Sequence, residues 1–138
     1  MITINYWAVL VSAALSLVVG GVWYGMLFGK KWVELSGMDK MSTEEQEKMK
    51  KASVKLYLLQ FAVSFFQVWV LAYYIAGWKD ASGLENALWI WAGFVATTLA
   101  GTMWESGTAK VKWMKFLLLA GAQFITFAVY GLVLGMWK

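Results

Sequence analysis

Four long stretches of the chain carry no charged side chain, and shorter polar segments separate them. A helix of about 20 apolar residues crosses the roughly 30 Å hydrocarbon core of a bilayer. Each stretch is long enough to do so. We therefore predict an all-α, integral-membrane four-helix bundle that forms one domain over residues 1–138, with spans at about residues 6–28, 56–78, 86–104 and 116–137.

The polar segment between the first two spans, residues 30–55, is predicted to hold a short cytoplasmic helix. Ser42 and Glu45 have the spacing of a capping box, which places the helix start near Thr43. Because no glycine or proline interrupts residues 43–76, this helix should continue into the second span. Such a charged, amphipathic segment is either a docking surface for a partner or lipid, or a solvated connector, which is the commoner case.

Composition agrees with a membrane protein and narrows the chemistry. The chain is 61% hydrophobic and only 14% charged, with a mean hydropathy of +0.60. Histidine, cysteine and arginine are absent, which removes the usual zinc, haem and copper ligands and the bidentate phosphate clamp. The glycines form no nucleotide-binding motif. We therefore expect no enzyme activity and no cofactor.

The lysines predict the orientation, because positively charged connections stay in the cytoplasm. Ten of the 12 lysines fall in residues 29–55 and 105–115, and only Lys79 and Lys138 lie elsewhere. We predict a multi-pass protein of the bacterial inner membrane, with both termini outside and these two connections inside. The net charge of +4 then indicates contact with the lipid bilayer and no nucleic-acid partner. Trp23, Trp32, Tyr57, Trp104 and Trp113 are expected at the inner membrane edge.

The chain begins with an apolar stretch, as a secretory signal also does. A signal peptide has a positively charged start, whereas residues 1–29 contain no charged side chain. The first span is therefore expected to be retained.

Polar side chains recur within the spans at steps of three or four residues, so each helix should carry one polar stripe. Lipid cannot hydrate such groups, and the stripes should face one another. We predict a polar cavity that opens inward; the alternative is ordinary hydrogen bonding between helices. The candidate cavity residues are Gln60, Gln67, Thr98, Thr102, Glu105, Gln123 and Thr126.

Rows of small residues also occur at helical spacing, and they permit close approach of helices. A four-span chain of this size has little interior of its own, so we expect a homo-oligomer. The rows are Gly21, Gly25 and Gly29; Gly93, Thr97 and Gly101; and Gly131 and Gly135.

Glu105 is the one carboxylate that adjoins a span. A partly buried acid can bind a cation or carry a proton. The alternative is an ion pair at the membrane edge, which is the usual outcome where lysines are abundant. Its expected partners are Lys110, Lys112, Lys30 or Lys31.

Several motifs resemble a bacterial integral-membrane family known as a domain of unknown function. They are GVWYGMLFGKKW (residues 21–32), GFVATT (93–98), the pair Trp104–Glu105, and AGAQF (120–124). The resemblance spans nearly the whole chain and implies four helices without implying an activity. The matching positions are Trp23, Tyr24, Phe28, Gly29, Lys30, Trp32, Thr97, Thr98, Trp104 and Glu105.

The chain departs from the family pattern at two places. Gly25 and Met26 replace the family's Ser-Pro, and Gln123 stands where a histidine often occurs. A histidine-based role is therefore not expected here. The predicted function is an oligomeric, non-enzymatic bundle that binds or translocates a small polar or lipophilic ligand. The alternative is an accessory or structural subunit of a larger membrane complex with no ligand of its own.

Overall fold

The computed structural model describes residues 1–138 and confirms the all-α architecture with four long apolar helices. The first span joins α1 (Tyr6–Gly21) to a π-helical segment, η1 (Val22–Leu27). The second and fourth spans are α3 (Thr43–Gly77) and α6 (Ala109–Met136). The third span joins α4 (Gly83–Ile90), the π-helical η3 (Trp91–Ala96), α5 (Thr97–Leu99) and the 3₁₀-helical η4 (Ala100–Trp104). Between the first two spans lie α2 (Gly29–Ser36) and the short η2 (Met38–Lys40).

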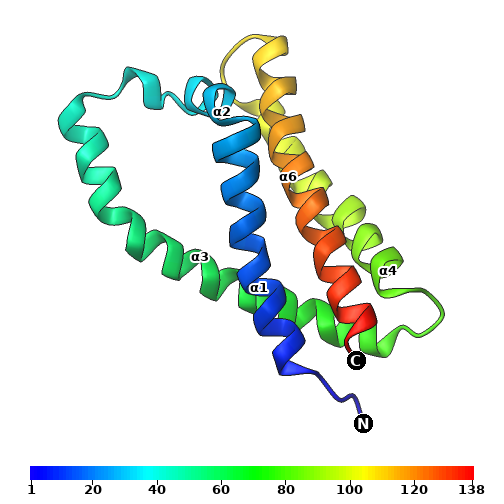
Figure 1. The fold of residues 1–138 in the computed structure, drawn as a ribbon. Helices are drawn as coiled ribbons and strands as arrows, with labels where there is room; N and C mark the ends of the chain where they lie inside the picture. Colours follow the sequence, from blue (N-terminus) through cyan, green and yellow to red (C-terminus); the bar gives the residue numbers. More distant parts are fainter.

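Both termini lie at one end of the bundle, as an even number of spans requires (Figure 1). The side-chain amide of Asn5 donates a hydrogen bond to the carbonyl of Trp137 at 3.2 Å, so the two ends of the chain are in contact. The opposite end is formed by residues 29–55 and 105–115. We call it the lysine-rich end.

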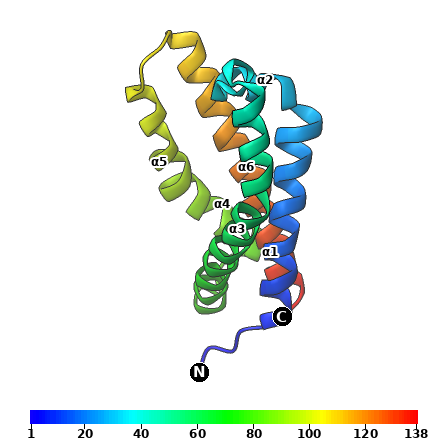
Figure 2. The ribbon, with the colours of Figure 1, turned by 90° about the vertical axis from the view of Figure 1, so that its left-hand side faces the viewer.

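Helix α6 lies between α1 and α4 and packs along both (Figures 1 and 2). Helix α3 packs against α1 through its C-terminal half, and its N-terminal half diverges from α1 toward the lysine-rich end (Figure 1). This divergence gives α2 and η2 a place beside the first turns of α3.

The start of α3 is confirmed where the sequence predicts it. The Ser42 hydroxyl accepts from the backbone N–H of Glu45, and the Glu45 carboxylate accepts from the backbone N–H of Ser42. Two otherwise unsatisfied donors are paired in this way, which fixes the first helical residue at Thr43. From there α3 runs without a break for 35 residues into the second span.

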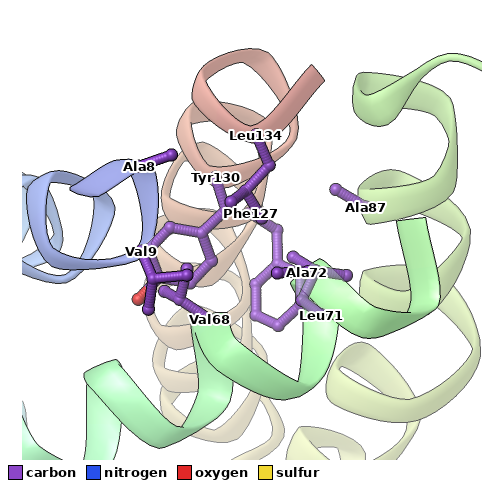
Figure 3. Packing of buried hydrophobic residues seen from close by; sticks show 9 residues of the cluster. All are labelled: Ala8, Val9, Val68, Leu71, Ala72, Ala87, Phe127, Tyr130 and Leu134. Carbon is purple, nitrogen blue, oxygen red and sulfur yellow. The ribbon is translucent and has the colours of Figure 1, made fainter. Parts of the chain in front are cut away.

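The buried core is small and lies toward the end that holds the termini. Only 19 of 138 residues are buried, so most apolar side chains face outward, as expected where lipid is the solvent. Figure 3 shows the core, in which side chains of α1, α3, α4 and α6 meet around Tyr130. Its members are Ala8, Val9, Val68, Leu71, Ala72, Ala87, Phe127, Tyr130 and Leu134.

Helices α4 and α6 approach most closely at three glycines. A β-carbon on Gly83 would lie 2.5 Å from the carbonyl oxygen of Gly131, and one on Gly131 would lie 2.6 Å from the carbonyl oxygen of Gly83. The row Gly131 and Gly135 is therefore used within one chain. By contrast, a β-carbon on Gly21, Gly25, Gly93 or Gly101 would meet no atom within 4 Å.

Candidate functional site

The two predicted cavity glutamines of α3 take part in hydrogen bonds. The side-chain amide of Gln60 donates to Ser64 of the same helix at 3.2 Å, and Gln67 accepts from the Tyr130 hydroxyl at 3.4 Å. The second of these bonds joins α3 to α6.

The remaining candidates are satisfied locally or lack a partner. The hydroxyls of Thr98 and Thr126 donate to carbonyls four residues earlier in their own helices. The Oγ1 of Thr102 and the Oε1 of Gln123 are buried and have no hydrogen-bond partner within the chain. Thr102 lies close to the lysine-rich end, whereas Gln123 lies two turns further along α6 than Lys115. The seven residues are therefore spread along the bundle.

Glu105 forms an ion pair with Lys115. This corrects the partner expected from the sequence, which was Lys110, Lys112, Lys30 or Lys31. The difference arises because Glu105 ends the third span and Lys115 lies nearly two turns into α6, so that antiparallel packing brings the two side chains to one level. The Glu105 side chain is 50% exposed, so the pair lies at the surface.

Trp23, one of the family-pattern residues, has its role inside the bundle. Its indole N–H donates to the carbonyl of Leu118 at 2.9 Å, and its ring lies against Gly121 so closely that a β-carbon there would be 2.8 Å from it. Trp23 therefore packs against α6 in addition to its expected position at the inner membrane edge. Sequence reasoning missed the corresponding role of Trp91, whose indole donates to the carbonyl of Ala120 at 3.1 Å.

Both of these tryptophans belong to π-helical segments, Trp23 to η1 and Trp91 to η3. The two segments flank α6 and donate to carbonyls only two residues apart in it. A π-helical turn carries an extra residue and changes the direction of the following side chains. These two hydrogen bonds hold the first and third spans against the same part of α6.

A cavity lies at the lysine-rich end, where residues of α2, η2 and the N-terminal half of α3 line it. Its volume is about 670 Å³, which is within the range of sites for small molecules. Gln60 is the one residue of the predicted set that lines it. The lining residues are Val33, Met38, Asp39, Gln46, Met49, Lys50, Ser53, Leu56, Tyr57 and Gln60.

Helix α3 supplies a continuous face to this cavity. Its lining residues recur at steps of three or four from Gln46 to Gln60, which is the period of one helix face. Gln60 lies fourteen residues after Gln46, which corresponds to about 21 Å of helix at 1.5 Å per residue. Both charged lining residues, Asp39 and Lys50, lie toward the start of the face together with Gln46, Met38 and Met49. Leu56 and Tyr57 lie further along α3, and Gln60 ends the face. The cavity is therefore elongated, with its charges at one end.

Local structure holds the polar end of the cavity in place. Gly37 ends α2 with a positive φ of 77°, a conformation that glycine adopts readily, and turns the chain back toward α3. The side-chain amide of Gln46 then donates to the carbonyls of Met38 and Met41, at 3.5 and 3.3 Å. These contacts fix η2 relative to the first turns of α3.

The sequence does contain the signal for this cavity. Met49, Ser53, Leu56 and Gln60 have helical spacing within and just beyond residues 30–55, a segment predicted to be either a docking surface or a solvated connector. What the sequence cannot show is that Val33 of α2 and Met38 and Asp39 of η2 line the same cavity as this face.

A second cavity, of about 480 Å³, lies between the third span and α6 toward the end that holds the termini. Its lining is mainly apolar, and Trp91 and Phe124 form an edge-on ring contact in it with centroids 4.9 Å apart.

Comparison with known proteins supports the resemblance seen in the motifs. A family model described as "Protein of unknown function (DUF1761)" matches residues 7–135. No curated protein and no solved structure matches the chain.

Proposed function

The chain belongs to the DUF1761 family, and from the cavity along α3 we propose that it is a non-enzymatic membrane protein that binds an amphipathic small molecule. One observation carries the proposal. The two charged side chains of the cavity, Asp39 and Lys50, lie at one end together with Gln46, and Leu56 and Tyr57 lie further along α3, before Gln60. An amphiphile likewise carries its charge at one end and apolar groups beyond it.

The size of the cavity supports an occupant with a chain. Each methylene group transferred from water to an apolar surface contributes about 0.8 kcal/mol. The α3 face beyond Lys50, as far as Gln60, spans about 15 Å at 1.5 Å per residue and can lie beside an extended alkyl chain. Five apolar side chains line the cavity as a whole, which are Val33, Met38, Met49, Leu56 and Tyr57.

The cavity should open toward the cytoplasmic leaflet, because it lies at the lysine-rich end. Positive residues on connections favour the cytoplasmic side, so we place the protein in the bacterial inner membrane with both termini outside. Ligand would then be taken up from the inner leaflet or released to it.

The proposal includes a homo-oligomer. In its most apolar window the third span is only 6% buried, and the glycines Gly93 and Gly101 on it have open space around them. Helix contacts in membranes depend on such small residues. A second copy packed on this span would form an interface that the monomer lacks.

The same exposure favours the alternative, in which the third span binds a different subunit and the protein has no ligand of its own. The two functions differ in a measurable way. An accessory subunit depends on its partner for stability, whereas a ligand-binding oligomer is stable alone and is stabilised further by its ligand.

Filling the cavity tests the proposal. Ser53 lies on the cavity face of α3, so Ser53→Trp should displace a bound amphiphile from protein purified in mild detergent, as measured by native mass spectrometry. Val54→Trp is the matched control, because Val54 is the next residue, is 66% exposed and does not line the cavity. Equal retention of amphiphile by both variants would refute the proposal.

A further inference from the structure

The cavity along α3 contains one side chain of each charge, Asp39 and Lys50. We propose that the ligand is a bilayer lipid with a zwitterionic head group, which has an ammonium group and a phosphate. This inference rests on the proposed function, the binding of an amphiphile in this cavity. The ammonium group would lie beside Asp39 and the phosphate beside Lys50. The acyl chains would follow α3 past Leu56 and Tyr57.

Neither charge is used elsewhere in the chain. The ion pairs of the protein are Lys31 with Glu34, Lys48 with Glu44, and Lys115 with Glu105. Asp39 and Lys50 belong to none of them, although both line the same cavity. A ligand that covers these side chains removes water from them, and charged groups that lose water require a partner of opposite charge.

The requirement for two opposite charges distinguishes ligand classes. An anionic amphiphile would pair with Lys50 and bring its negative charge close to Asp39. A cationic amphiphile would pair with Asp39 and bring its positive charge close to Lys50. Only a ligand with both charges satisfies the two side chains together.

The elements that carry the two charges are joined by hydrogen bonds. Asp39 belongs to η2, and Lys50 lies one turn after Gln46 on α3. The Gln46 side chain donates to the carbonyls of Met38, the first residue of η2, and Met41, which follows it. The backbone of η2 is therefore held at the start of α3, and ligand binding does not have to order this connection.

The depth of the charges agrees with a lipid in its usual orientation. Asp39 and Lys50 lie at the end of the cavity nearer the start of α3, and Leu56 and Tyr57 lie about one to two helical turns beyond Lys50, in the direction of the second span. Lysine extends its charged end toward water while its methylene groups cover apolar surface. A head group at this level would place its chains alongside the second span.

The test uses an equimolar mixture of three diacyl lipids with the same chains, in which the head is phosphoethanolamine, phosphoglycerol or trimethylammonium. The full-length protein is exchanged into this mixture, and native mass spectrometry counts each retained lipid. The phosphoethanolamine lipid should exceed each of the others about tenfold, the ratio expected from one additional charge-assisted hydrogen bond.

Two variants should change the preference in opposite directions. Asp39→Asn should increase the share of phosphoglycerol lipid, and Lys50→Gln should increase the share of trimethylammonium lipid. Glu47→Gln and Lys51→Gln are the matched controls, because they make the same charge changes on α3 outside the cavity. Their lipid ratios should equal those of the unmodified protein.

The outcomes separate this inference from the proposed function. Suppose that Asp39→Asn and Lys50→Gln retain the three lipids in the same ratios as their control variants, while Ser53→Trp still displaces lipid. The assignment to a zwitterionic head group is then wrong, and the proposed amphiphile site stands. If Ser53→Trp displaces no lipid, both are wrong. Glycerophosphoethanolamine, the same head group without chains, should not displace the lipid at equal concentration. Displacement would identify a soluble zwitterion and overturn the assignment to a lipid.

Discussion

The contact between α4 and α6 leaves no room for a side chain on Gly131, which makes Gly131→Ala the most direct test of the packing. A β-carbon at this position would lie 2.7 Å from the Cα of Leu84 and 2.8 Å from the Cβ of Ala87. Non-bonded carbon atoms are most stable at about 3.5–4.0 Å. The two helices would have to separate by about 1 Å.

The magnitude follows from two opposing effects. Overpacking of this kind costs about 1–3 kcal/mol. Alanine has a higher helix propensity than glycine by about 1 kcal/mol, which offsets part of that cost. The steric effect is larger, so Gly131→Ala should lower the free energy of unfolding by about 1–2 kcal/mol.

Two other glycines calibrate the result. At Gly135 the nearest atom to an added β-carbon is the Cα of Gly83 at 3.2 Å, so Gly135→Ala should have a smaller effect. Gly20 has nothing within 4 Å, and Gly20→Ala should raise stability by up to about 1 kcal/mol. Unfolding in mixed micelles, followed by tryptophan fluorescence, compares the three variants. Equal stability of Gly131→Ala and Gly20→Ala would refute the close approach of α4 and α6.

Three further predictions concern the spans and the lysine-rich end. Trp23→Phe removes the indole donor to α6 and should cost about 1 kcal/mol of stability in the same assay, whereas Trp104→Phe changes a residue that is 93% exposed and should cost nothing. Glu105→Gln breaks only the surface ion pair with Lys115, so stability should fall by less than about 1 kcal/mol; a loss of ligand binding in this variant would show that the carboxylate has a functional role. Lys48→Cys should react with an impermeant maleimide in inverted vesicles and not in intact cells, and labelling of intact cells would contradict the orientation.

The sequence alone determined the features that depend on neighbouring residues and on the surrounding solvent. The four spans follow from apolar length, because lipid requires each crossing helix to satisfy its own backbone hydrogen bonds. The start of α3 follows from Ser42 and Glu45, which are three residues apart and make their contacts within one helical turn. No distant part of the chain influences either result.

The packed structure alone decided the contacts between helices that are far apart in sequence. Three lysines follow Glu105 within ten residues, and Lys30 and Lys31 lie in the other connection at the same end of the bundle. Only the packing of the third span against α6 selects Lys115 as the partner. Likewise, Trp23 could have faced lipid, and the close approach of η1 to Gly121 directs it to α6.

The same distinction applies to the candidate site. Helical spacing identified Gln60 as a cavity residue but grouped it with residues that lie elsewhere along the bundle. The face of α3 is periodic in the sequence, whereas the position of η2 beside its first turn depends on the turn at Gly37 and on the contacts of Gln46. Periodicity fixes which side chains share a helix face, and the rotation and register between helices, which only the folded chain sets, decide what that face meets.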